Sequence, residues 1–245
     1  IIKIVKTQKL YNKKKDFIIK PKTILKFNLI FIFILFLFHS SFLFEFRFNN
    51  TNDVSIYGRF FLFDYENNLP TFYSSIAIAI SSVLTFFISL IKEIKKQEKP
   101  FWISLSIIFG ILCIDEWKMI HEKINNTAFV YINQKLNIPV SIGSAWTYLY
   151  IIFAVMFCIS FSLFTFKLPK DIKKLFILSF LIYVFGGLGM ELFAFEVLKI
   201  DTQQNNLYLI LHTLEELFEM IGISIFNFSL LKYILKYKKI VLENG

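Results

Sequence analysis

The sequence predicts an all-α, polytopic membrane protein: a six-transmembrane-helix bundle with both termini cytoplasmic. Three observations lead to this prediction. Hydrophobic residues fill 56% of the 245 positions and charged residues only 18%, which is unlike the composition of soluble domains. Six apolar segments reach the roughly 20 residues needed to cross a hydrocarbon layer about 30 Å thick. Lysines, finally, gather at alternate ends of these segments.

The six predicted spans form one transmembrane domain, residues 27–236, between a basic tail, 1–26, and a short C-terminal tail, 237–245. Their shared features are high apolar content and length, and they occupy residues 27–46, 72–91, 101–123, 143–166, 174–197 and 207–234. Two longer connections, 47–71 and 124–142, contain the Asn, Pro and Gly residues typical of non-helical chain. The sequence has no internal repeat and no separate soluble domain.

The distribution of basic residues predicts the orientation of the spans. All but six of the 27 lysines and arginines fall in the N-terminal tail, in segments 92–99 and 167–174, and in the stretch after residue 231. Cytoplasmic flanks retain positive charge during insertion, so we expect these regions in the cytoplasm of a bacterial cell and the protein in its inner membrane. Basic flanks that face anionic lipid also explain the net charge of +9. Membrane lipid, and no nucleic acid, is the expected partner.

The stretch HTLEELFEMIG, residues 212–222, places one histidine and three glutamates inside an apolar span, where ionisable side chains are energetically costly. His212, Glu215, Glu216 and Glu219 recur at i, i+3, i+4 and i+7, so they share one helix face. A carboxylate at the centre of a membrane helix costs roughly 2.5–3.5 kcal/mol on insertion scales. These groups therefore need a compensating partner or a functional reason.

Other spans deliver acidic and histidine side chains to the same layer. At about 1.5 Å per residue, Asp115 and Glu116 lie about 21 Å from the inner surface, and Glu191 comes to nearly the same level. The protein's three histidines, His39, His121 and His212, also lie on the outward side. Glycines accompany the acidic residues at positions 186, 187, 189 and 222, where they would let helices approach closely.

Charge neutralisation within one helix is the competing interpretation for some of these groups. Lys118 shares a face with Asp115 and Glu122, and Glu196 pairs in the same way with Lys199. The groups without a comparable lysine on their own helix are Glu116, Glu191, Glu215, Glu216 and Glu219, with His212. They are therefore the stronger candidates for function.

Carboxylates with imidazole and no thiolate favour iron, manganese or zinc as a bound divalent metal. The ligand inventory is similar to that of four-helix di-iron proteins, although His212 and Glu215 have the reversed order His-x-x-Glu. We predict a metal site whose ligands are drawn from His212, Glu215, Glu219, Glu191, Glu116, Asp115, Glu216, His121 and His39.

Four motifs carry a resemblance to a group of proteins. They are FLFDYENNLPTFYSS, D-E-x4-H-E at residues 115–122, GGLGMELFAFE, and H-x2-E-E-x2-E at residues 212–219. Together they resemble uncharacterised bacterial multi-pass membrane proteins, from about residue 60 to the end of the chain. The resemblance implies a membrane location and no named activity.

Three hypotheses for function follow. The first is a metal-binding membrane protein, either an enzyme such as an oxidoreductase or hydrolase or a non-catalytic binder, with its site open to the periplasmic side. The second is a cation or proton-coupled transporter, in which polar groups would continue to the cytoplasmic side. The third is a structural subunit that pairs its acidic residues with other membrane subunits. A lipid-facing acidic stripe on the last span would favour the third.

Overall fold

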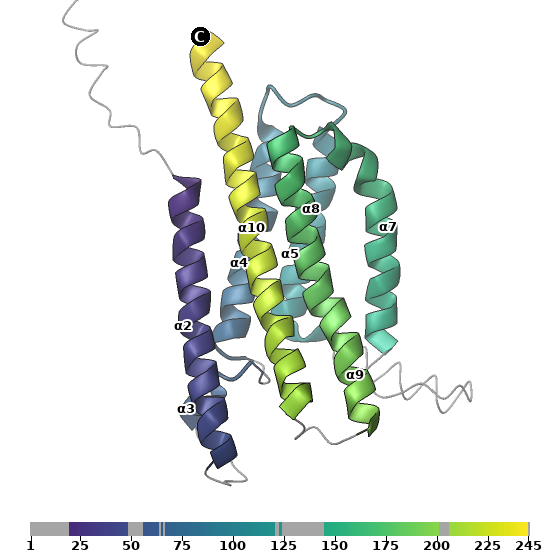
Figure 1. The fold of residues 1–245 in the computed structure, drawn as a ribbon. Helices are drawn as coiled ribbons and strands as arrows, with labels where there is room; N and C mark the ends of the chain where they lie inside the picture. Colours follow the sequence, from purple (N-terminus) through teal and green to yellow (C-terminus); the bar gives the residue numbers. More distant parts are fainter. Residues whose placement is uncertain are drawn as a thin grey trace, which may run out of the picture.

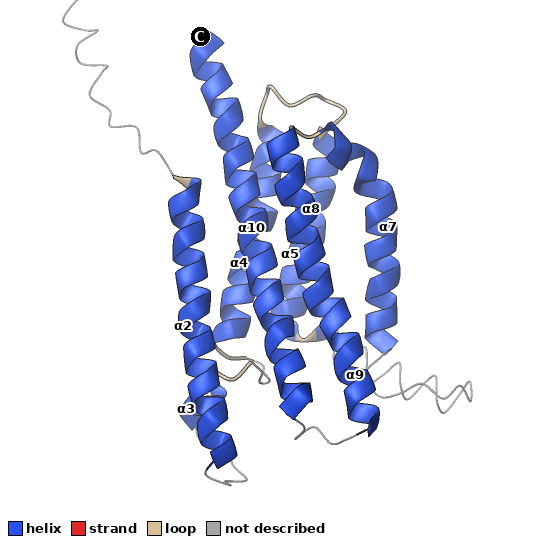
Figure 2. Ribbon diagram, in the orientation of Figure 1, coloured by secondary structure: helices blue, strands red, loops and turns tan. Residues whose placement is uncertain are grey.

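A computed structural model describes residues 20–48, 56–63, 65, 67–120, 123, 145–200 and 206–244. Secondary structure in this part of the chain is helical throughout (Figures 1 and 2). Six of the helices there are long and apolar enough to cross a membrane. The predicted fold class, an all-α polytopic membrane protein, is therefore confirmed.

The helices follow one another in the order that the apolar segments predict. They are α2 (Pro21–Phe48), the short α3 (Ile56–Arg59), α4 (Leu69–Leu90), α5 (Lys99–Lys118), α7 (Ala145–Lys167), α8 (Lys170–Val184), the π-helix η1 (Phe185–Met190), α9 (Glu191–Ile200) and α10 (Asn206–Asn244). The helices α8, η1 and α9 form one continuous rod, which corresponds to the fifth predicted span (Figure 1).

Local chemistry explains where the helices begin and end. Pro21 opens α2, six residues before the predicted start, because proline suits the first helical turn. Asn68 caps α4 by accepting a hydrogen bond from the backbone N–H of Thr71 at 3.0 Å. Met119 adopts a left-handed conformation (φ 51°) and ends α5 at Lys118, earlier than the predicted residue 123. At the other end of the chain, α10 continues through most of the predicted tail 237–245.

The helix α10 occupies the centre of the bundle, where it packs against α8, α4 and α2 (Figure 1). At the lysine-rich end the core is aromatic: fully buried Trp102 meets Phe164, Phe176 and Tyr233 with ring centroids 5.0–6.0 Å apart. Such ring pairs stabilise a core beyond the area that they bury. This end of the bundle is therefore apolar and tightly packed.

Polar side chains of α4 join it to its neighbours. Ser81 donates a hydrogen bond to the side chain of Asn227 on α10 at 2.8 Å, and Asn227 donates in turn to the backbone oxygen of Ala77 at 2.8 Å. Ser82 donates to the backbone oxygen of Ser106 on α5 at 2.7 Å. Serine in membrane helices commonly links helices in this way, and Ser81 and Ser82 both do so here.

Candidate functional site: an acidic cluster at one end of the bundle

The acidic face of α10 is turned toward the bundle. Glu215 is the most buried of its carboxylates, with 9% of its surface exposed. Its Oε2 atom lies 3.8 Å from Nδ1 of His212, one turn earlier on the same helix. This distance is too long for a hydrogen bond but short enough for direct electrostatic interaction. At Glu215 the acidic stripe therefore does not face lipid, the position that would have favoured a structural subunit.

Glu191, at the start of α9, meets this face of α10. Its side chain forms a hydrogen bond with Glu215, and the carboxyl groups of Glu219 and Glu216 lie within electrostatic range of Glu215. A carboxylate can only accept hydrogen bonds, so two carboxyl groups that bond to each other must share a proton. The pair Glu191–Glu215 thus holds one proton in this geometry.

Glycines allow this meeting of helices. A Cβ atom on Gly187 of η1 would lie 2.0 Å from Oε1 of Glu219, and one on Gly186 would lie 3.0 Å from the backbone oxygen of Glu215. On α10, a Cβ atom on Gly222 would lie 2.8 Å from the backbone nitrogen of Tyr183. The close approach predicted from the glycines is confirmed at these three positions. At Gly189 the nearest atoms belong instead to Phe185 of the same helix.

The π-helical turn that carries Gly186, Gly187 and Gly189 has the sequence FGGLGM. A π-helix has a wider turn than an α-helix, is rare, and often occurs at functional sites. Here it connects α8 to Glu191 and covers the side chain of Glu219. The π-helical turn therefore helps to set the positions of Glu191 and Glu219.

A second group of acidic residues comes from α5. Asp115 is buried and accepts a short hydrogen bond from the hydroxyl of Tyr150 on α7. Tyr183 on α8 lies within electrostatic range of Asp115, Glu116, Glu216 and Glu219. This tyrosine therefore connects the two groups into one acidic cluster, which we define as Asp115, Glu116, Glu191, Glu215, Glu216 and Glu219.

His39 has a different environment from the acidic residues. Its Nδ1 atom accepts a hydrogen bond from the backbone N–H of Phe63 at 3.1 Å, and the Phe63 ring stacks on the imidazole with centroids 4.2 Å apart. Because Nδ1 is an acceptor, the ring proton is on Nε2, which donates to Oγ1 of Thr213 at 2.9 Å. The Thr213 hydroxyl in turn donates a hydrogen bond to the backbone oxygen of Leu209 at 2.6 Å.

Both ring nitrogens of His39 are thus engaged by protein groups, and neither can take a metal ion in this conformation. His39 instead joins α2, the segment after α3, and α10. Phe63 and Thr213 have no motif in the sequence that would have revealed them as its partners. Tyr150 and Tyr183 were also missed, although a phenol inside an apolar span usually has a polar partner.

The other predicted ligands are His121, His212 and the residues of the acidic cluster. His121 lies outside the described residues. Within the described ranges, no group of three or more His, Cys, Asp or Glu side chains is positioned as a ready-made metal site. The side chains of the acidic cluster would therefore have to move to surround an ion.

Comparison with known proteins places the chain in a family. No curated protein and no solved structure matches it. A family model described as "Domain of unknown function (DUF8692)" matches residues 29–233, a range that contains the whole acidic cluster and reaches into all six membrane helices. The chain therefore belongs to this family of unknown function, DUF8692.

Proposed function

We propose that this integral membrane protein binds a divalent metal ion at the acidic cluster. One observation carries the proposal. Glu215 is more than nine-tenths buried beside three other carboxyl groups, and its Oε2 atom makes no hydrogen bond to any described residue. A buried carboxyl oxygen without a hydrogen bond is costly, and a cation is the ligand that would satisfy it.

The residue types at this position fit iron, manganese or zinc. Glu215, Glu219 and Glu191 supply hard oxygen atoms and His212 supplies a borderline nitrogen. Ligand carboxylates must be deprotonated, so the ion would replace the proton that Glu191 and Glu215 share. Metal and proton therefore compete for the site. When bound, such an ion would supply Lewis-acid or redox chemistry.

The orientation of the lysines supports a position for the site in the outer half of the membrane. The cluster lies at the end of the bundle opposite segments 92–99 and 167–174, which carry eight lysines. With that end in the cytoplasm, the cluster faces the periplasmic side of a bacterial inner membrane. A metal supplied from outside the cytoplasm is then the expected ligand.

The test is the metal-to-protein ratio of Glu215→Gln. Glutamine keeps the size of the side chain and one oxygen but removes the anionic charge, so we expect stoichiometric metal to be lost while the protein stays folded. Elemental analysis would follow loading with Fe²⁺, Mn²⁺ or Zn²⁺ and removal of loosely bound ions. Glu93→Gln is the control, because Glu93 is exposed in the loop at the opposite end of the bundle.

Two results would contradict the proposal. The parent protein could bind none of the three ions, or Glu215→Gln could bind as much metal as the parent. In either case the buried carboxyl pair would be a protonated structural element, and the glutamine variant would be at least as stable as the parent, since it removes a titratable group from a low-dielectric site.

Proton-coupled cation transport is the second candidate, and the hydrogen bond between Glu191 and Glu215 favours it. A proton held between two carboxyl groups inside the membrane is a feature of proton relays. Cation flux into proteoliposomes driven by a pH gradient would distinguish the two functions. A transporter shows flux that Glu191→Gln abolishes, whereas a binding protein retains stoichiometric metal without flux.

A further inference from the structure

The first half of α2 contributes little to the core of the bundle. Burial on this helix begins at Ile32 and Leu35, which are 3% and 1% exposed. Before them, side chains such as Phe27 and Ile30 are open, at 66% and 44% exposure. Within the described residues, this part of α2 therefore presents an open surface at the lysine-rich end of the protein.

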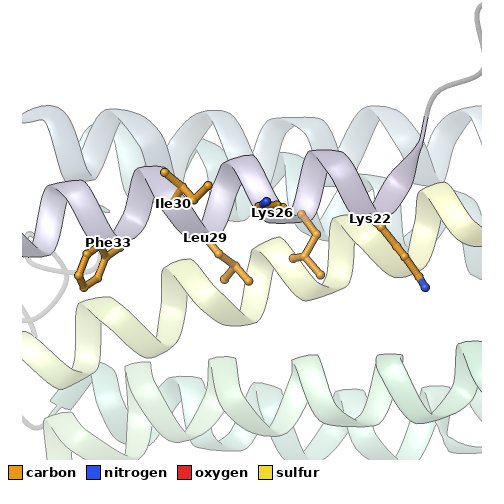
Figure 3. Close-up of a pocket in the computed structure, with 6 residues that line it drawn as sticks. Lys22, Lys26, Leu29, Ile30 and Phe33 are labelled. Carbon is orange, nitrogen blue, oxygen red and sulfur yellow. The ribbon is translucent and has the colours of Figure 1, made fainter.

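Side chains on this surface line a shallow, open groove of about 380 Å³. The groove is lined by Lys22, Leu25, Lys26, Leu29, Ile30 and Phe33. Figure 3 shows these side chains spread along α2, with α10 running beside the helix. The two lysines lie at one end, and every lining residue beyond Lys26 is apolar.

The length of the groove matches one leaflet of a membrane. Lys22 and Phe33 are eleven residues apart, which corresponds to about 16 Å along a helix. Half of a hydrocarbon layer about 30 Å thick is about 15 Å. Lys22 and Lys26 can extend their ammonium groups to the headgroup level, while Phe33 lies near the middle of the bilayer.

The two lysines at one end of the groove determine which kind of ligand it can bind. Among the described residues, neither Lys22 nor Lys26 forms an ion pair with a carboxylate. By contrast, Lys232 on α10 lies 2.9 Å from the carboxylate of Asp171. Two exposed ammonium groups one helical turn apart can bind a phosphate together, and the apolar wall below them can hold an acyl chain.

We propose that this groove binds one anionic phospholipid of the lysine-rich leaflet. Its phosphate would bind Lys22 and Lys26, and one acyl chain would lie along Leu25, Leu29 and Phe33. The lipid would cover the part of α2 that the described bundle leaves open. This site lies at the opposite end from the acidic cluster, so it does not depend on the proposed metal binding.

The test uses the full-length protein in detergent with phosphatidylglycerol or phosphatidylcholine added, and native mass spectrometry to count bound lipid. The parent should retain one phosphatidylglycerol in preference to phosphatidylcholine. Lys22→Gln/Lys26→Gln should weaken this retention roughly tenfold or more, since each lysine near an anionic headgroup contributes about a factor of five. Lys95→Gln/Lys96→Gln is the control, because both of its lysines are exposed at the same end of the bundle.

A second variant tests the apolar part of the groove. Leu29→Trp should fill the space below the lysines and reduce retention of phosphatidylglycerol without any change of charge. The proposal is overturned if the two double-lysine variants lose lipid equally, because the attraction would then be diffuse. It is also overturned if Leu29→Trp retains lipid like the parent, or if a second copy of the chain occupies this face and a lysine-dependent dimer appears instead.

Discussion

A single methyl group should have opposite effects at two glycines of the acidic end. At Gly222 on α10, an added Cβ would lie 2.8 Å from the backbone nitrogen of Tyr183 and 3.0 Å from its Cα. Backbone atoms cannot move away without shifting α8 as a whole. Overpacking of this kind costs about 1–3 kcal/mol, and the better helix propensity of alanine returns about 1 kcal/mol. Gly222→Ala should therefore destabilise the protein by up to about 2 kcal/mol.

At Gly187 the obstructing atoms belong to one flexible side chain. An added Cβ would lie 2.0 Å from Oε1 of Glu219, 3.2 Å from its Cδ and 3.8 Å from its Cγ. The carboxylate can rotate away, so the bundle keeps its packing and gains about 1 kcal/mol of helix propensity. The acidic cluster, however, loses Glu219 from its present position. Gly187→Ala should therefore leave stability unchanged or raised and reduce metal binding.

Two measurements on each variant separate these effects: the thermal midpoint in detergent and the metal-to-protein ratio. Gly110→Ala is the matched control, because its Cβ would meet only Oγ of Ser82 at an ordinary 3.5 Å. If the thermal midpoint falls as far in Gly187→Ala as in Gly222→Ala, the Glu219 side chain does not rotate away from the added methyl group, and the reasoning is refuted. Unchanged metal content in Gly187→Ala would remove Glu219 from the proposed ligands.

Three further predictions concern orientation, His39 and pH. Cysteines introduced at positions 52 and 137 of an otherwise cysteine-free chain should react with an impermeant reagent from outside the cell; reaction only from the cytoplasmic side would reverse the predicted orientation. His39→Phe keeps the ring stack but leaves the buried N–H of Phe63 without its acceptor, which should cost about 1–3 kcal/mol in thermal unfolding. This variant should keep its metal, and loss of metal would restore His39 to the ligand set. Metal retention should also fall steadily as pH is lowered, because protons and metal compete for the same carboxyl pair; a pH-independent ratio would contradict this.

The sequence predicts the fold and the acidic layer well because both follow from the cost of burying charge. A helix needs about 20 consecutive apolar residues to cross a bilayer, so each span can be recognised in the sequence. Each carboxylate inside a span needs a partner, so Glu191 and Glu215 were expected to meet, and they do. The glycines at positions 186, 187 and 222 indicated where helices could come close enough for this.

Other features depend on contacts that no local pattern encodes. The π-helical turn of η1 and the left-handed residue Met119 each change a helix by a few residues, within the error of any reading by periodicity. His39 looked like a ligand because imidazole is a common metal ligand, yet its partners are the backbone of Phe63 and the hydroxyl of Thr213. Phe63 lies in a stretch that the sequence predicts as an external connection. Only the packed structure shows that it enters the bundle.

The behaviour of Glu215→Gln and Gly187→Ala together decides what the acidic cluster does. Suppose that the carboxyl groups serve only to join α9 to α10 through the proton shared by Glu191 and Glu215. An amide at position 215 can replace the protonated acid in that hydrogen bond, and Glu219, which lies against Gly187, can move without consequence. Both variants would then be stable and neither would change any measured binding. If the cluster holds a cation instead, each variant removes one anionic ligand. Glu215→Gln removes the charge of Glu215, and Gly187→Ala displaces the carboxylate of Glu219. Loss of metal in both, with stability kept in both, is a result that structural pairing alone does not produce.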